Sequence, residues 1–375
     1  MSLSLLLALV LAGSPWPLPG HDPANTGWNP TAPAVTALRH QWTIPAPVGV
    51  AECAAPPVPP VVAGGRLFLL DRSTNGVAAH DAATGARLWT WQGTYYFRAA
   101  RLAVAGDLLI VVEEPCHLSD EDTRVAALDV ATGALRWQRY GSWRTPGIVL
   151  DRGILVTGGN CPGCISDIAY RMHGVRVADG TTAWESAWQD IAGPVSANGR
   201  ILVTAAGRDP FPGVPAPKWT LLDIRTGKRI WHTRIPTAGV RAADPGGERL
   251  YLAEAHGMRV VAAATGRRLW ATGVGRAGGV AVDDRRVYVS FPGQVRAYDA
   301  GTGRFRWARA MTAPGRPVRA GSVLYVPTGA TMAILDPASG STVALSAPFR
   351  PVTGPPVVAD GRLYLTDGAT VRAYA

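Results

Sequence analysis

Residues 125–137 read Val-Ala-Ala-Leu-Asp-Val-Ala-Thr-Gly-Ala-Leu-Arg-Trp, the pattern of a strand, a tight turn and a second strand. The first part is rich in aliphatic residues, and Leu135 and Trp137 resume an alternating pattern after the turn. Asp129, Thr132 and Gly133 supply the turn, because Asp and Thr bond to nearby backbone groups and glycine accepts a positive φ. The stretch therefore predicts a β-hairpin.

The unit Asp-x-x-Thr-Gly-x-x-x-Trp recurs along the chain, and its tryptophans are separated by 47, 48, 47, 47, 39 and 37 residues. A period of roughly 40 residues is typical of a four-stranded propeller blade. A last copy has lost its tryptophan and carries Ala344 instead. The tryptophans belong to outer strands, where we expect structural docking between blades: Trp42, Trp89, Trp137, Trp184, Trp231, Trp270 and Trp307.

Trp42 has no preceding hairpin partner, and the last repeat, at residues 363–374, lacks its turn and its tryptophan strand. The simplest closure lets the N-terminal strand complete the C-terminal blade, which removes exposed sheet edges. Seven internal hairpins and this split one predict an all-β, eight-bladed propeller of four-stranded antiparallel blades.

The period and motif resemble the pyrroloquinoline-quinone-like (PQQ-like) β-propeller repeat family over residues 16–375. The stretch at residues 21–30, His-Asp-Pro-Ala-Asn-Thr-Gly-Trp-Asn-Pro, is similar to the lead-in of many members. The resemblance implies the fold more strongly than the function, because the family includes quinone-dependent alcohol and sugar dehydrogenases as well as the propeller subunit of the outer-membrane barrel assembly machine.

The formal net charge of +10 comes almost wholly from arginine, since Lys218 and Lys228 are the only lysines. These arginines are scattered through turns and strand ends without a basic run, so we expect no nucleic-acid binding. Residues 1–14 hold an apolar run that is too short to span a bilayer and lacks a basic region. Because Gly, Ser and Pro follow, we interpret it as an incomplete secretion signal. The rest, residues 15–375, is expected to be one extracytoplasmic propeller domain.

The four cysteines map to the loops of one face and one sector of the ring: Cys53, Cys116, Cys161 and Cys164. An even number in an exported chain favours disulfides over a zinc site, which usually offers two Cys-x-x-Cys pairs. Of the three possible connectivities we prefer Cys161–Cys164 with Cys53–Cys116. We expect no metal site.

The longest loops lie in the same sector, and long loops on a rigid scaffold commonly bind ligands or partners. We therefore expect a binding face there. Its candidate residues are Glu113, Glu114, His117, Asp120, Asp122, Asn160, Arg208, Asp209, Phe211 and Lys218.

The quinone dehydrogenases that share this repeat use a vicinal Cys-Cys disulfide and a calcium site, whereas this chain has no adjacent cysteines. It also has no nucleophile or phosphate-loop motif, so no catalytic residue and no cofactor are predicted. We expect a non-catalytic scaffold, a monomer without a membrane span, which docks a protein or cell-envelope partner through the cysteine-bearing face. The alternative is a PQQ-dependent oxidoreductase of the alcohol or sugar dehydrogenase type, with PQQ and calcium in the central channel.

Overall fold

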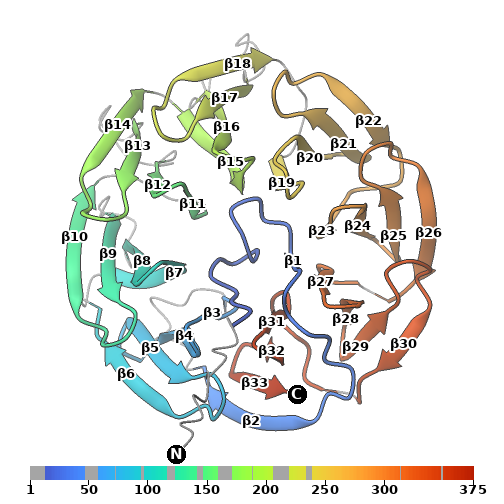
Figure 1. Cartoon of the computed structure of the whole chain (residues 1–375), viewed down its shortest axis with the longest axis horizontal. Helices are drawn as coiled ribbons and strands as arrows, with labels where there is room; N and C mark the ends of the chain where they lie inside the picture. Colours follow the sequence, from blue (N-terminus) through green and yellow to red (C-terminus); the bar gives the residue numbers. More distant parts are fainter. Residues whose placement is uncertain are drawn as a thin grey trace, which may run out of the picture.

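The computed structural model is a ring of eight β-sheets around a central channel, as Figure 1 shows. It describes residues 13–46, 58–71, 73–93, 97–115, 123–141, 147–158, 171–187, 189–205, 219–233, 239–312, 314–347 and 349–375. Within these ranges every regular element is a strand. The predicted eight-bladed all-β propeller is confirmed.

Each of the first four blades runs from an inner to an outer strand in antiparallel order. Blade 1 comprises β3 (Val61–Ala63), β4 (Arg66–Asp71), β5 (Gly76–Asp81) and β6 (Arg87–Trp91). Blade 2 comprises β7 (Phe97–Ala105), β8 (Leu108–Pro115), β9 (Thr123–Asp129) and β10 (Leu135–Gly141). Blade 3 comprises β11 (Val149–Asp151), β12 (Ile154–Thr157), β13 (Arg171–Arg176) and β14 (Thr182–Ala187). Blade 4 comprises β15 (Gln189–Ser196), β16 (Arg200–Ala205), β17 (Trp219–Asp223) and β18 (Arg229–Thr233).

The last four blades repeat this order and close the ring. Blade 5 comprises β19 (Gly239–Ala243), β20 (Arg249–Glu254), β21 (Gly257–Ala262) and β22 (Arg268–Thr272). Blade 6 comprises β23 (Val280–Val282), β24 (Arg286–Phe291), β25 (Gln294–Asp299) and β26 (Phe305–Ala310). Blade 7 comprises β27 (Val318–Ala320), β28 (Val323–Thr328), β29 (Thr331–Leu335) and β30 (Thr342–Leu345). Blade 8 comprises β31 (Val357–Ala359), β32 (Arg362–Thr366), β33 (Thr370–Tyr374) and β2 (His40–Pro45).

The ring closes as the orphan Trp42 predicts, because N-terminal β2 pairs antiparallel with C-terminal β33. The backbones of Arg39 and Ala375 extend this pairing through two hydrogen bonds of 3.0 Å. One strand is additional to the predicted pattern. The short β1 (Trp28–Asn29) runs parallel to β27 on the channel side of blade 7, so that this sheet has five strands.

The core lies between neighbouring blades, where aliphatic residues of the middle strands are fully buried. In blades 5–8 the third residue of the second strand is a buried tyrosine: Tyr251, Tyr288, Tyr325 and Tyr364. Each phenol has a hydrogen-bond partner, as a buried hydroxyl requires. These rings fill the space between wedge-shaped blades that aliphatic side chains fill in blades 2–4.

Each tryptophan of the repeat packs on the turn glycine of the following blade. A Cβ at Gly180 would lie 2.7 Å from Cε3 of Trp137, and the other six pairs approach within 3.3 Å. The indole nitrogen donates to a backbone oxygen of the same turn, as Trp184 does to Ile224 at 2.7 Å. These contacts explain why the last copy has Ala344. In blade 8 the chain ends replace the turn, so blade 7 has no turn glycine to cover.

The repeated aspartates fold the turns by accepting hydrogen bonds. In Asp129, Oδ1 accepts from the backbone nitrogen of Thr132 at 2.9 Å and from its hydroxyl at 2.9 Å. Asp299 does the same with Thr302. The Thr132 hydroxyl, followed by Arg136, lowers the pKa of Asp129 to about 2. Hydrogen bonding by Arg306, followed by Thr302, lowers that of Asp299 to about 2. These carboxylates must be ionised for the turns to be fully bonded.

We therefore expect the melting temperature to fall as the pH is lowered from about 4 to about 2. An aspartate with a lowered folded pKa stabilises the fold above its unfolded pKa of about 3.9, and this contribution is lost as the pH falls through the folded value. Calorimetry between pH 6 and pH 2 measures the fall. In the double variant D129N/D299N it should be shallower than in the wild type, and an equal fall would contradict the assignment.

Candidate functional site

Residues 14–29 cross one end of the central channel, and we name them the channel floor (Figure 1). This segment exchanges backbone hydrogen bonds with the inner strands of seven blades or with the residue that follows them. Its partners are Val62, Val104, Ser196, Ala243, Val282, Arg319 and Asp360. Most of these residues stand at the C-terminal end of their strand. The floor therefore satisfies backbone groups that the innermost strands would otherwise leave unpaired.

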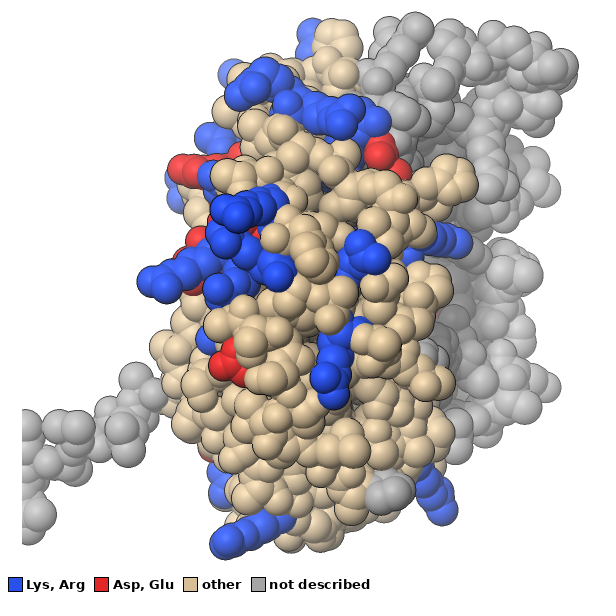
Figure 2. Space-filling model, turned by 90° about the vertical axis from the view of Figure 1, so that its right-hand side faces the viewer, with Lys and Arg blue, Asp and Glu red and all other residues tan. Residues whose placement is uncertain are grey.

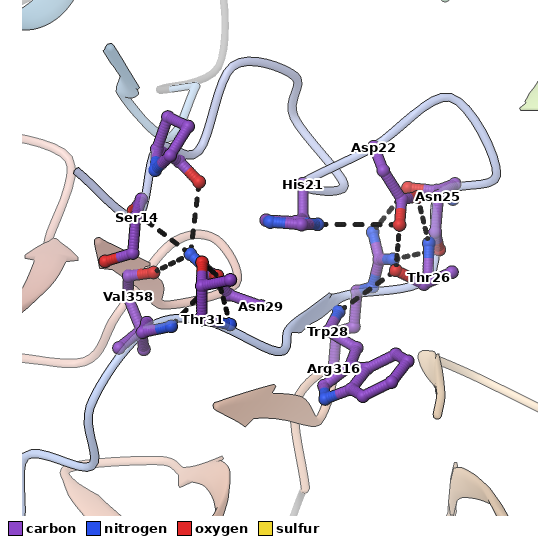
Figure 3. Close-up of polar contacts among 12 residues, drawn as sticks. Ser14, His21, Asp22, Asn25, Thr26, Trp28, Asn29, Thr31, Arg316 and Val358 are labelled. Carbon is purple, nitrogen blue, oxygen red and sulfur yellow. Dashed lines mark hydrogen bonds and ion pairs between the residues drawn. The ribbon is translucent and has the colours of Figure 1, made fainter. Parts of the chain in front are cut away.

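The floor is folded by its own short polar side chains (Figure 3). Asp22 accepts from the backbone nitrogen of Thr26 at 3.0 Å and from the Thr26 hydroxyl. The amide nitrogen of Asn29 donates to Val358 at 3.0 Å and to two floor carbonyls, and Asn29 is fully buried. Trp16 is only 1% exposed and anchors the segment in the core shared by blades 7, 8 and 1. The side chains of the stretch at residues 21–30 thus fold the floor into a segment that is docked against the blades.

A cavity of about 520 Å³ lies at the opposite ends of inner strands from blades 5–7, and we name it the arginine cavity. Arg241 of β19 reaches it from a position two residues before the floor contact at Ala243. Arg276 reaches it from the loop that leads into β23. The remaining walls are Ala277, Gly278, Ser290, Phe291, Pro292 and Pro314.

Arg316 does not line this cavity, but its charge interacts with that of Arg241. It lines a second cavity of about 320 Å³, formed with residues at the end of β28 and in the loop that leads into β31. Its guanidinium donates to Asn25 Oδ1 at 3.0 Å and to the Asn25 carbonyl at 2.7 Å (Figure 3), and also to the Val280 carbonyl at 3.1 Å. All three of these acceptors are neutral oxygens, so the bonds orient the charge without cancelling it.

The three arginines gather positive charge that the described residues compensate only in part. Burial lowers the pKa of Arg316 to about 10, the charge of Arg241 adds to this effect, and Asp22 opposes it. Burial, followed by the charge of Arg276, lowers the pKa of Arg241. Among the described residues, Nε of Arg241 is buried without a hydrogen-bond partner. Such a site favours an anion, and carboxylates match the planar donors of arginine.

Outside the channel, arginines also gather on the rim that Figure 2 shows, which is the right-hand side of Figure 1. Exposed arginines of β22, β26 and their turns are Arg267, Arg268, Arg304, Arg306 and Arg309. The charge of +10 is thus spread over the rim as well, and rim arginines offer matched controls for the cavity.

The expected binding face is mostly outside the described residues. These include His117, Asp120, Asp122, Asn160, Arg208, Asp209, Phe211 and Lys218, and the cysteines Cys53, Cys116, Cys161 and Cys164. Of the two described candidates, Glu113 is fully buried and forms an ion pair with Arg124, so it does not face solvent. Glu114 is partly exposed, and Oε1 lies 3.5 Å from Arg101. Glu113 is buried because β8 continues to Pro115 and pairs Glu113 with Arg124 of β9.

Sequence reasoning also missed Arg241, Arg276, Arg316 and Asn25. They lie in different repeats or in the lead-in, and no motif connects them. The described part of the chain holds no group of three or more His, Cys, Asp or Glu side chains placed to bind a metal ion. It also has no helix with the length and apolarity needed to cross a membrane.

Comparison with known proteins decides the family. The family model described as outer membrane protein assembly factor BamB, built on PQQ-like repeats, matches residues 37–144, 171–315 and 292–375. The chain belongs to this PQQ-like propeller family. No curated protein matches it.

Solved structures share the fold at low sequence identity. The quinohemoprotein alcohol dehydrogenase of Comamonas testosteroni is 15% identical with a TM-score of 0.66, over 96% of this chain and 80% of that one. BamB of Moraxella catarrhalis is 16% identical with a TM-score of 0.60, over 90% and 97%. A europium-containing methanol dehydrogenase is 12% identical with a TM-score of 0.65, over 96% and 98%.

These findings correct the expected function. The prediction of a non-catalytic scaffold is wrong, because the similar structures include alcohol and methanol dehydrogenases that cover nearly the whole chain. Its reasoning relied on the missing vicinal cysteines.

Proposed function

We propose that this member of the PQQ-like family is an oxidoreductase of the PQQ-dependent type and that the quinone binds in the arginine cavity. The observation that carries the proposal is the convergence of Arg241 and Arg276 on a cavity of about 520 Å³, with Arg316 adjoining it. Small-molecule sites typically measure about 300–1,000 Å³. The dehydrogenases with a similar fold support the same assignment.

The residues present fit this cofactor. PQQ is a planar, tricarboxylated quinone, and the cavity offers guanidinium groups for the carboxylates and Phe291 as an apolar wall. Arg241 Nε is a buried donor that still lacks a partner among the described residues. The chemistry that the group supplies when bound is two-electron oxidation of an alcohol or sugar hydroxyl to a carbonyl.

The chain's own residues would bind the quinone, orient it and enclose it. Arg241 and Arg276 would hold carboxylates from β19 and from the loop before β23, two rigidly supported positions. The floor is held by hydrogen bonds to blade backbones, and these would keep Asn25 in place beside Arg316. Calcium belongs to the same proposal. Its ligands are left unassigned because the described residues include no cluster for it.

Arg276→Gln is expected to weaken PQQ binding about 10- to 100-fold, because a charge-assisted hydrogen bond contributes about 1.5–3 kcal/mol. Isothermal titration with PQQ, with and without calcium, measures the affinity, and a dye-linked assay with alcohols and sugars measures turnover. The matched control is Arg304→Gln on the rim, which should bind like the wild type. A wild-type protein without saturable PQQ binding would refute the proposed function.

We further propose an extracytoplasmic location, which the family description as an outer membrane assembly factor supports. The expectations of a monomer, of a protein or cell-envelope partner and of no nucleic-acid binding stay predictions. Gel filtration of the full chain tests the expectation of a monomer. Fractionation of cells that produce the full chain tests the extracytoplasmic location.

A further inference from the structure

We propose that Asn25 of the channel floor is the positioning residue of the arginine cavity, and that the cavity takes small polycarboxylates. This inference rests on the proposed anionic ligand of the same site. It adds that the floor is part of the binding site and that an uncharged residue is required at position 25.

Asn25 lies where the floor passes beneath the three arginine-bearing blades. The neighbouring carbonyls of Ala24 and Thr26 accept from Ala243 of β19 and Val282 of β23 at 2.8 Å each. The carbonyl of Gly27 accepts from Arg319 of β27 at 2.8 Å. Asn25 itself adopts a φ of +55°, which Asn and Asp tolerate better than other non-glycine residues. Its position is therefore fixed by backbone contacts on both sides.

The Asn25 side chain contacts two of the arginine-bearing segments, and Figure 3 shows its contact with Arg316. Its amide nitrogen donates to the backbone carbonyl of Arg241 at 2.6 Å. Its Oδ1 accepts from Nη1 of Arg316 at 3.0 Å, while its backbone carbonyl accepts from Nη2 at 2.7 Å. One side chain thus links the strand that carries Arg241 to the guanidinium of Arg316.

Close packing leaves this arrangement little freedom. A Cβ at Gly20 would meet Asn25 Oδ1 at 1.6 Å, so only glycine at position 20 leaves room for the amide. A Cβ at Gly279 would lie 2.5 Å from Cβ of Arg316, so glycine is needed there as well. Both glycines therefore allow the backbone to approach the Asn25–Arg316 contact closely.

The chemistry of the amide explains why its charge matters. An amide oxygen orients Arg316 but leaves its positive charge available to a ligand, whereas a carboxylate would neutralise it. An ionised aspartate also has no N–H to donate to the Arg241 carbonyl. Asp22 already places one negative charge near Arg316, so a second would cancel much of the field of the cavity.

The test compares Asn25→Asp with Asn198→Asp, using citrate and PQQ as separate probes. Asn198 is a matched control because it has a φ of +53° and also accepts from an arginine, Arg152, outside the cavity. Isothermal titration gives the affinities, and calorimetry gives the melting temperatures. We expect N25D to bind citrate at least about 10-fold more weakly than the wild type, and its melting temperature shows that it is folded. N198D should bind like the wild type.

The other outcomes of this test either overturn or support the inference about Asn25. Equal citrate affinity in N25D and the wild type, equal losses in N25D and N198D, or no citrate binding by the wild type would overturn the inference. If N25D does not fold, Asn25→Gly keeps the backbone conformation, and unchanged citrate affinity in N25G would overturn it instead. Citrate binding that depends on Asn25 without any PQQ reduction would support the inference while refuting the oxidoreductase. PQQ turnover together with wild-type citrate affinity in N25D would support the oxidoreductase while overturning the inference about Asn25.

Discussion

Trp184→Ala is expected to lower the free energy of unfolding by about 3–5 kcal/mol, the range for truncating a buried tryptophan. The ring is 8% exposed and lies between two glycines, and a Cβ at Gly227 would lie 2.6 Å from it. Its indole nitrogen donates to the Ile224 carbonyl of the next blade at 2.7 Å. The variant would lose this hydrogen bond and leave a cavity at the junction of blades 3 and 4. Urea unfolding followed by circular dichroism measures the loss.

Leu135→Ala is the control for this prediction. Leu135 also begins an outer strand, but it is 47% exposed, so its truncation should change stability by no more than about 0.5 kcal/mol. A loss of less than about 1 kcal/mol in Trp184→Ala would mean that neighbouring blades hold together without the tryptophan, and that the repeat is conserved along the chain for another reason.

The ring could be predicted from the sequence because its determinants are local and repeated. The Asp–Thr–Gly turn and the tryptophan recur in nearly every blade, and each copy forms contacts with the next one only. The closure also followed from local evidence, since Trp42 lacked a hairpin partner and the last repeat lacked its outer strand. A copy that departs from the motif does not obscure the fold, because the other copies preserve the period.

The floor and the arginine cavity could not be predicted in this way. Residues 14–29 have no alternating pattern, and their hydrogen bonds go to inner strands spread over the whole chain. Arg241, Arg276 and Arg316 occupy unrelated positions of their repeats and come near one another because the inner strands of blades 5, 6 and 7 pack side by side. Asn25 and Arg316 are 291 residues apart in the sequence. Such contacts depend on three-dimensional geometry that a single sequence does not record.

Glu113 was misplaced for a different reason. The sequence analysis placed both glutamates on the loops of the expected binding face, whereas β8 continues to Pro115. Glu113 pairs in register with Arg124 of β9, so the two side chains face each other across the sheet. The guanidinium also lies over the ring of Trp91, 5.1 Å from its centre. The basic partner 11 residues later was the available signal, because a hairpin brings such pairs together.

Glu113→Ala is expected to destabilise the protein by about 3–5 kcal/mol, because it leaves the Arg124 charge buried without its carboxylate. Glu113 and Arg124 are 0% and 4% exposed, and Nη2 of Arg124 donates to Oε1 at 2.7 Å. Burial raises the pKa of Glu113 although Arg124 acts in the opposite direction. Removing the charged carboxylate from water therefore costs free energy that the ion pair must offset. The double variant Glu113→Leu, Arg124→Leu removes both charges and should lose less stability than the single variant.

The neighbouring Glu114→Ala separates this effect from the loss of any acidic side chain in the strand. Glu114 and Arg101 are 24% and 29% exposed and lie 3.5 Å apart, so their ion pair should contribute no more than about 1 kcal/mol. Urea unfolding of the three variants and the wild type under one condition gives the comparison. If Glu113→Ala cost no more than Glu114→Ala, or if the double variant lost more than the single one, then Arg124 would be accommodated by water and Trp91 rather than by Glu113.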